Sequence, residues 1–326
     1  MKILVAGSSG FIGSHLTPKL VERGHQVIGF DLHEPTGDYG ISGFVQGDIR
    51  RKDDLVAALE GVDAAVNLAA IHFDYGHEDH EYWETNEAGT QAFLDAMEES
   101  GVQRFLFTSS IAVYGDRADE ASETTEPTPT SVYGASKLGG EHVIEKWVDG
   151  ATDRSVVIIR PCVVFGERNV TNMNNLIRQI DSGFFVMFGK GENVKATAYV
   201  ENLAAAICMQ VESMEPGLLV FNYADKPDLQ VKEIVSVIRT ALGKSSTAPT
   251  FPLWLGLLAA KPFDFITKIT GKNLPVSSAR VQKLTIPTQV AAQKIRDAGY
   301  QQPVATEEGL RRMVKYFSQS KRSESQ

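Results

Sequence analysis

The first 31 residues constrain the fold of this chain more than any other segment. Met1–Asp31 reads as an apolar run rich in β-formers, a glycine-rich turn, a helix-length segment and a second apolar run that ends on an acid. Gly7, Gly10 and Gly13 follow the pattern G-x-x-G-x-x-G, which suits a tight turn and the close approach of backbone N–H groups to a pyrophosphate. This order of strand, turn, helix and strand predicts a dinucleotide-binding site.

The acid at the end of the second run indicates which dinucleotide binds. Asp31 lies 18 residues after Gly13, where a carboxylate can bond both hydroxyls of an adenosine ribose. A carboxylate there repels a 2′-phosphate, and the following Leu32-His33-Glu34 holds no arginine. The sequence therefore predicts NAD, rather than NADP, as the cofactor.

Composition and charge exclude several classes of protein. The chain has 326 residues and is 43% hydrophobic, so it can bury a large core. Its net charge is −9 and it has no basic block, so no nucleic-acid partner is expected. Cys162 and Cys208 lie in apolar segments without metal-ligand spacing, which indicates reduced packing residues. The first strand begins at the N-terminus, and no apolar stretch reaches the roughly 18 residues of a membrane span. We therefore expect no signal peptide, no membrane insertion and a cytoplasmic location.

Strand-like runs alternate with helix-length segments through the first half of the chain. The runs are Ile3–Ala6, Gln26–Phe30, Gly43–Gln46, Ala64–Leu68, Arg104–Thr108 and Val156–Arg160. This alternation predicts an α/β fold with a doubly wound parallel sheet of the Rossmann type. Beyond Gly166 the pieces are shorter and are expected at the carboxyl ends of the strands, where ligand crevices lie. We therefore expect an NAD-binding domain over residues 1–166, with later segments returning to the sheet, and a smaller C-terminal substrate-binding lobe over 167–318.

The sequence also predicts individual helices and the character of the C-terminal segments. Helices are predicted at Asp53–Leu59, Thr85–Ser100, Tyr133–Val148, Val200–Glu212 and Gln230–Leu242, and Met173–Gly183 is one of the shorter pieces beyond Gly166. Phe251–Ala260 is too short for a membrane span and favours a buried helix of a small C-terminal subdomain over a membrane-surface segment. The small polar residues at 319–326 predict a disordered tail.

A second cluster of residues carries the chemistry. Ser109 and Ser110 follow a predicted strand, while Tyr133 and Lys137 lie four residues apart and therefore share one face of a predicted helix. A free phenol has a pKa of about 10, so a tyrosine base near neutral pH needs a pKa about three units lower. An adjacent ammonium and the positive charge of an oxidised nicotinamide can supply that shift. Together these groups can take the proton of an alcohol while its hydride leaves for the cofactor.

Motifs along almost the whole chain indicate a family. The chain resembles the extended short-chain dehydrogenase/reductase family, specifically its NAD-dependent epimerase/dehydratase branch, whose members act on nucleotide sugars. The matching motifs, in family order, are GSSGFIG at Gly7–Gly13, GDI at Gly47–Ile49, NLAA at Asn67–Ala70, TNEAGT at Thr85–Thr90, TSSIAVYG at Thr108–Gly115, YGASK at Tyr133–Lys137 and RPCVVFG at Arg160–Gly166.

The resemblance implies roles for individual residues. Ser110 orients the substrate hydroxyl, Tyr133 is the acid/base, and Lys137 lowers the tyrosine pKa while holding the nicotinamide ribose. The implied cofactor contacts are Gly7, Gly10, Phe11, Ile12 and Gly13 at the pyrophosphate, Asp31 at the ribose, Asp48 and Ile49 at the adenine, Leu68, Ala69, Ala70 and Ser109 along the cofactor, Pro161 at the nicotinamide, and Asn86 as a support of the active-site backbone. Asp48 can also cap the N-terminus of the next helix, and that role is compatible with a contact to the cofactor.

The implied substrate contacts lie mostly in the second half of the chain. They are Ser110, Asn174, Asn175, Leu176, Lys195 and Arg280. Lys195 stands where relatives often carry arginine, which weakens bidentate phosphate recognition but keeps a point charge. Arg280 fits a diphosphate contact and an exposed helix charge equally well.

The histidines of the segment Ile71–Trp83 do not predict a metal site. His72, His77 and His80 are irregularly spaced, and their position matches the family's variable loop, which covers the substrate. We therefore expect no bound metal.

The residues after the active-site hydroxyl limit the reaction. Relatives that dehydrate nucleotide sugars carry an Asp-Glu pair there, and this chain has Ile111-Ala112, which disfavours 4,6-dehydration. We therefore expect NAD-dependent epimerisation through a transient keto intermediate, at C4 of a UDP-hexose or UDP-N-acetylhexosamine used for polysaccharide synthesis. The apolar C-terminal segment resembles such members and also the steroid-dehydrogenase-like branch. An NAD-dependent dehydrogenase or reductase of a sugar, steroid or lipid alcohol is therefore the alternative, and a non-catalytic NAD-binding scaffold is disfavoured by the intact catalytic residues.

The family resemblance also implies a homodimer. In the family fold, helices corresponding to Thr85–Ser100 and Tyr133–Val148 pair with their copies in a four-helix contact. The apolar residues Ala92, Phe93, Met97, Val143 and Trp147 serve such a seam or the core equally well.

Overall fold

A seven-stranded parallel sheet forms the centre of the computed structural model, which describes residues 1–72, 76–258, 261 and 287–323. Its order is β11-β6-β5-β4-β1-β2-β3. The strands are β1 (Lys2–Ala6), β2 (Gln26–Asp31), β3 (Gly43–Gln46), β4 (Ala64–Asn67), β5 (Arg104–Thr108), β6 (Ser155–Pro161) and β11 (Gly217–Tyr223). The winding direction changes between β1 and β4, which opens a crevice at their carboxyl ends. This topology confirms the predicted doubly wound fold.

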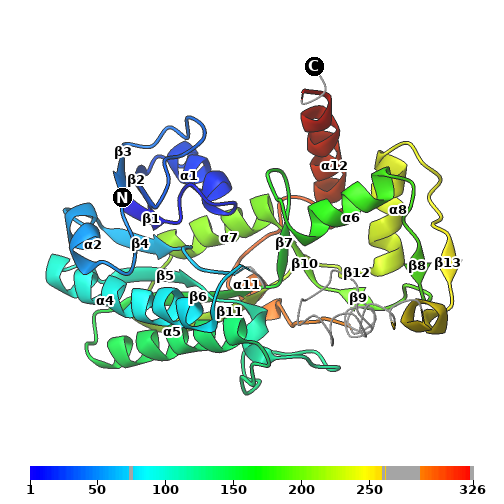
Figure 1. The fold of residues 1–326 in the computed structure, drawn as a ribbon. Coiled ribbons are helices and arrows are strands. Elements are labelled where there is room, and N and C mark those ends of the chain that lie inside the picture. The colour runs from blue at the N-terminus through cyan, green and yellow to red at the C-terminus, as the bar shows by residue number, and fades with distance from the viewer. Residues whose placement is uncertain (73–75, 259–260, 262–286, 324–326) are drawn as a thin grey trace.

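Helices cover both faces of the sheet (Figure 1). Ile3 and Val5 of β1 pack in a core with α1 (Gly13–Glu22) and α7 (Val200–Glu212), whereas Leu4 and Ala6 pack in a second core on the other face. That second core includes side chains from α2 (Lys52–Ala58), α4 (Gly89–Ser100) and α5 (Val132–Asp149). Because side chains alternate along a strand, an apolar run such as Lys2–Ala6 buries both of its faces.

The apolar residues of α4 and α5 belong mainly to this second core. Phe93 and Met97 are fully buried, Trp147 is 9% exposed, and all three pack in the same cluster as Phe105. Val143 packs partly buried against the same cluster. These side chains therefore contribute to the core of one chain, and no subunit seam is needed to explain their burial.

A smaller lobe continues from the carboxyl end of β6 (Figure 1). Its helices α6 (Asn172–Asp181), α8 (Val231–Ala241) and α12 (Thr306–Ser323) share a third core that includes Phe165 and Tyr199. Short strands pair in twos around this core: β7 (Val163–Phe165) with β10 (Thr197–Tyr199), β8 (Met187–Phe188) with β13 (Thr250–Phe251), and β9 (Val194–Lys195) with β12 (Leu229–Gln230). A short helix, α11 (Gln293–Asp297), follows. No helix in the described ranges is long and apolar enough to span a membrane.

The C-terminal residues differ from the predicted disordered tail. Helix α12 runs to Ser323, so residues 319–323 are helical. The Lys321 ammonium lies 2.6 Å from Asp181 Oδ2 of α6, and the Ser320 hydroxyl donates to the carbonyl of Tyr316. The polar composition at this end therefore belongs to the outer face of a helix whose inner face packs on the lobe.

The segment predicted as a buried helix is helical only in part, and two large side chains of that part are exposed. Residues 253–258 form a helix, in which Trp254 is 62% exposed and Leu258 is 54% exposed. Only one face of so short a helix can pack, and here Gly256 lies against the ring of Phe188. Residues 259–260 lie outside the described part of the chain.

Candidate active site

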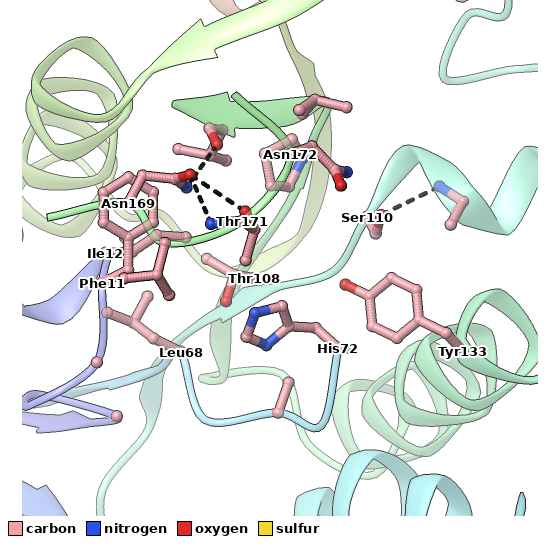
Figure 2. A pocket seen from close by; sticks show the side chains of 18 of the residues that line it. Phe11, Ile12, Leu68, His72, Thr108, Ser110, Tyr133, Asn169, Thr171 and Asn172 are labelled. Atoms are coloured by element: carbon pink, nitrogen blue, oxygen red, sulfur yellow. Dashed lines mark hydrogen bonds between the residues drawn. The ribbon is translucent and has the colours of Figure 1, made fainter. Parts of the chain in front are cut away.

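One cavity of about 1740 Å3 lies at the carboxyl ends of the central strands and brings most of the predicted site residues together. Figure 2 shows part of it, with Tyr133, Ser110 and His72 on one side and Phe11, Ile12 and Leu68 on the other. The predicted residues that line it are Gly7, Gly10, Phe11, Ile12, Gly13, Asp31, Asp48, Ile49, Leu68, Ala69, Ala70, Ser109, Ser110, Tyr133, Lys137, Pro161, Asn174 and Lys195.

Three of the predicted residues that the structure describes lie elsewhere. Asn86 is buried behind the cavity wall, Asn175 is exposed on α6, and Leu176 packs against the third core. Helix periodicity explains the last two, because the cavity-facing side of α6 carries Asn174 and, four residues later, Arg178. Arg280 lies outside the described residues.

The glycine-rich turn fits a dinucleotide diphosphate. Gly7 has a φ of +79°, and a Cβ on Gly13 would lie 2.1 Å from the carbonyl oxygen of Gly7, so neither position accepts a side chain. The N–H groups of Phe11 and Ile12, at the start of α1, donate to no acceptor within the described ranges. Such donors at a helix start are a binding site for an anion.

Asp31 is fixed at the end of β2. Its Oδ2 accepts a hydrogen bond from the N–H of Ser9 at 3.0 Å, and its Oδ1 accepts from the N–H of His33 at 3.2 Å. Each carboxylate oxygen keeps a lone pair for a further donor. The carboxylate therefore has a set orientation in the cavity wall and the capacity to accept two ribose hydroxyls.

We expect the Asp31 carboxylate to set the cofactor preference. Asp31→Ala removes both an acceptor for the ribose hydroxyls and the repulsion of a 2′-phosphate, so it should narrow the preference for NAD over NADP by at least tenfold. Calorimetric titration of both dinucleotides into the unsubstituted protein and the variant measures this ratio. Equal affinity of the unsubstituted protein for NAD and NADP would contradict the ribose assignment.

Helix α5 presents Tyr133 and Lys137 to the cavity. The hydroxyl of Ser131 caps the helix by accepting from the N–H of Gly134 at 3.1 Å. Lys137 is 1% exposed, and its ammonium lies 4.1 Å from the ring centroid of Phe107 with no hydrogen bond to a described residue. Burial lowers the pKa of Lys137 to about 7, against the opposing charge of Glu141. An ammonium that is buried without an acceptor fits a bound ligand that supplies hydroxyl oxygens.

A buried ion pair supports the base of this helix. The Arg160 guanidinium donates from Nε to Glu141 Oε1 at 2.9 Å and from Nη1 to the Tyr114 hydroxyl at 2.7 Å. The Tyr114 hydroxyl in turn donates to Asn222 Oδ1 at 2.8 Å. These contacts connect α5 to β6 and β11 beneath the cavity, and they satisfy charges that burial would otherwise make costly.

Ser110 occupies a position from which it can donate. It caps a 3₁₀ turn, η2 (Ile111–Tyr114), and its Oγ accepts from the N–H of Ala112 at 3.1 Å (Figure 2). This bond uses a lone pair and leaves the hydroxyl hydrogen for another acceptor. The buried hydroxyl of the neighbouring Ser109 has no partner among the described residues, which marks a second polar atom able to meet a ligand.

Asn86 holds two walls of the site together. Helix α3 (Asp79–Tyr82) runs into a π-helical segment, η1 (Trp83–Ala88), and then into α4, so this helical stretch begins well before the predicted Thr85. The Asn86 amide exchanges hydrogen bonds of 3.0 Å with the backbone of Ile71 and donates to Ser136 Oγ at 2.9 Å. Ser136 then donates to the carbonyl of Tyr133 at 2.9 Å. A π-bulge of this kind commonly aims a side chain at a functional site.

Several lining residues were given no site role from the sequence, although the resemblance places the loop of His72 over the substrate. His72, from the loop after β4, projects into the space that Tyr133 also faces (Figure 2). The segment between Gly166 and α6 contributes Arg168, Asn169 and Thr171, and α6 adds Asn172 and Arg178. The sequence did hold a sign of these residues, because they are polar and directly follow the RPCVVFG strand. The carboxyl ends of parallel strands lie at one edge of the sheet, where ligands bind.

Comparisons with known proteins agree with this geometry. Residues 3–222 match the model of the NAD dependent epimerase/dehydratase family. The chain is 38% identical, over 96% of its length and 94% of the relative's, to N-acetyl-alpha-D-glucosaminyl-diphospho-ditrans,octacis-undecaprenol 4-epimerase of Escherichia coli O157:H7. It is 28% identical to the 2-alkyl-3-oxoalkanoate reductase of Stenotrophomonas maltophilia over 96% of this chain and 98% of that one. The structure of UDP-glucuronic acid 4-epimerase from Bacillus cereus in complex with NAD superposes with a TM-score of 0.77, at 25% identity and over 98% and 99% of the two chains.

Proposed function

Because this chain belongs to the NAD-dependent epimerase/dehydratase family, we propose that it is a 4-epimerase of a hexose or N-acetylhexosamine joined to its carrier through a diphosphate. The observation that carries this proposal is the meeting of Ser110, Tyr133 and Lys137 in the same cavity as the glycine-rich turn. A sugar carbon held there would lie between an acid/base and a dinucleotide.

The proposed mechanism uses three side chains of this chain. NAD, when bound, supplies the acceptor and later the donor of a hydride. Tyr133 Oη takes the proton of the C4 hydroxyl as that carbon is oxidised, and it returns the proton to the C4 oxygen when the carbon is reduced from its other face. The Ser110 hydroxyl donates to the same oxygen, and the Lys137 ammonium favours the phenolate of Tyr133. Inversion then requires only that the keto sugar turn within the cavity before it is reduced.

The cations of the lobe support a diphosphate-linked substrate. Arg178 and Lys195 line the cavity together with Asn174, at the side formed by α6 and β9. Two flanking cations suit two phosphates, whether the carrier is a nucleotide or a polyprenol. The relative with 38% identity is named for an undecaprenol-linked substrate, so both carriers belong in a test of this proposal.

The proposal predicts inversion at C4 without net redox change. Purified protein is incubated with UDP-glucose, UDP-N-acetylglucosamine and undecaprenyl-diphospho-N-acetylglucosamine in separate reactions, and the products are identified by NMR. We expect one of them to form its C4 epimer while the absorbance of NADH at 340 nm stays flat. Stoichiometric NADH would instead support a dehydrogenase, for which the similarity to the named reductase is the specific observation.

A homodimer and a cytoplasmic location remain predictions of this proposal. The helices expected to form the dimer contact, α4 and α5, lie side by side on one face of the sheet (Figure 1). Light scattering at micromolar concentration measures the mass, and the mass of a single chain would contradict the predicted homodimer.

A further inference from the structure

One arginine stands out at the boundary between the sheet domain and the lobe. Arg168 lies between β7 and α6 and has a φ of +66°. Among the described non-glycine residues, it alone has a positive φ. This left-handed conformation costs free energy for a residue with a side chain. Such residues persist where the surrounding structure over-determines them, and they cluster at functional sites.

Hydrogen bonds on both sides of Arg168 fix its backbone. The carboxylate of Glu167 accepts from the Tyr199 hydroxyl at 3.0 Å, and the carbonyl of Glu167 accepts from Nε2 of His15 at 2.9 Å. After Arg168, Oδ1 of Asn169 accepts from the N–H of Thr171 at 3.0 Å (Figure 2). The strained conformation is therefore held by neighbours from α1 and from the lobe.

The side chain of Arg168 reaches the dinucleotide domain. Its Nη1 lies 3.3 Å from the carbonyl oxygen of Ser14, in the first turn of α1, and 3.4 Å from the hydroxyl of Tyr39. The guanidinium carbon lies 5.5 Å from the Tyr39 ring centroid. These contacts are long and involve one nitrogen, so Nε and Nη2 keep their donors for another acceptor.

Of the described cations that line the cavity, Arg168 extends its guanidinium to the first turn of α1, beside the glycine-rich turn. Arg50 is committed to Asp48, to which its Nε donates at 2.9 Å. Lys137 lies beside Tyr133, and Arg178 belongs to α6. The unused N–H groups of Phe11 and Ile12 carry only partial charge, whereas a dinucleotide diphosphate carries two full negative charges.

We propose that Arg168 is a cofactor-binding residue whose guanidinium bonds the diphosphate of NAD at the start of α1, so that the lobe takes part in holding the cofactor. This role goes beyond the proposed epimerisation and requires only that NAD bind. It also gives a reason for the strained backbone, because a relaxed conformation would direct the side chain elsewhere. An enzyme that oxidises and then reduces the same molecule benefits from such a contact, since the cofactor must stay bound between the two steps.

The test is a set of binding measurements on Arg168→Gly. Glycine adopts a positive φ at no steric cost, so the variant should keep or raise the melting temperature while it loses the guanidinium. By calorimetry, we expect the Kd of NAD and of ADP-ribose to rise about 10- to 100-fold and the Kd of adenosine, which lacks phosphate, to change less than twofold. Arg168→Lys should lie between the two proteins because a lysine keeps a point charge.

Controls separate this role from structural ones. Arg311→Ala removes an exposed positive charge of α12 outside the cavity and should leave the Kd of NAD unchanged. Unchanged affinity for NAD and ADP-ribose in Arg168→Gly would overturn the proposal. An equal loss for all three ligands, or a lowered melting temperature with unchanged Kd, would instead assign Arg168 to the adenosine pocket or to the fold. None of these readouts depends on which sugar the enzyme takes, so failure of the epimerase proposal leaves the result interpretable.

Discussion

Tyr133→Phe should lower kcat about 10²- to 10⁴-fold while the Kd of NAD changes little. The substitution removes the one group proposed to move a proton. It keeps the ring of residue 133, which lines the cavity. Because the phenol acts on the substrate oxygen, its loss affects the chemical step more than the binding of either ligand. Steady-state kinetics on the identified substrate, combined with calorimetry of NAD, separates the two effects.

A matched control for this variant is Tyr316→Phe. Tyr316 lies on α12, lines the same cavity and is 40% exposed, but it comes from the lobe rather than from α5. If loss of any cavity-lining phenol were enough to reduce turnover, both variants would be impaired to a similar degree. Near-normal kcat in Tyr133→Phe would show that another group is the acid/base, and His72 would be the first residue to substitute.

Lys137→Met should abolish turnover at least as fully as Tyr133→Phe and, unlike it, should stabilise the cofactor-free protein. The ammonium of Lys137 is buried without a hydrogen bond to a described residue, and burial lowers the pKa of Lys137 to about 7. Methionine keeps the length of the side chain and removes the charge, so the free energy of unfolding should rise by about 3 to 5 kcal/mol below pH 7. The residue is therefore costly to the fold, which supports its assignment to function.

The stability gain of Lys137→Met should depend on pH. Below pH 7 the lysine is charged in the folded and unfolded states, and the full cost of the buried charge is present. Between about pH 7 and 10.5 the unfolded chain holds the proton that the folded protein has lost, so the stability of the unsubstituted protein rises with pH. Denaturant unfolding at pH 6 and pH 9 should therefore show the larger difference between the two proteins at pH 6. An equal difference at both pH values would contradict the buried-charge assignment.

Much of the fold could be predicted because local patterns and topology agree. The continuous apolar run of β1 and the spacing from Gly7 to Asp31 determine a strand, a turn and a helix whose packing follows from the sequence. The family comparison and the sheet order confirm the predicted Rossmann fold, the resemblance and NAD. The individual cofactor and substrate roles, and the boundary at residue 166, stay predictions.

The remainder depends on tertiary contacts that no local pattern carries. The π-helical turn at Trp83–Ala88 places Asn86 against Ile71, and the positive φ of Arg168 is held by bonds to α1 and to the lobe. On α6, the residues Asn174, Asn175 and Leu176 were expected to act together, but helix periodicity turns the partly buried Leu176 against the third core. Exposure of Trp254 could not be inferred from apolar composition, because composition does not tell how many faces of a short helix find a partner.

A substrate that carries deuterium at C4 tests directly whether the enzyme inverts that carbon by removing and returning its hydride. The purified protein is incubated with the substrate identified above, labelled at that carbon, and the product is analysed by NMR and mass spectrometry. We expect a C4 epimer that retains the deuterium at C4, because the hydride taken from that carbon is returned to it. Replacement of the deuterium by solvent hydrogen in the epimer, or formation of the keto sugar with stoichiometric reduced cofactor as the end product, would contradict the account.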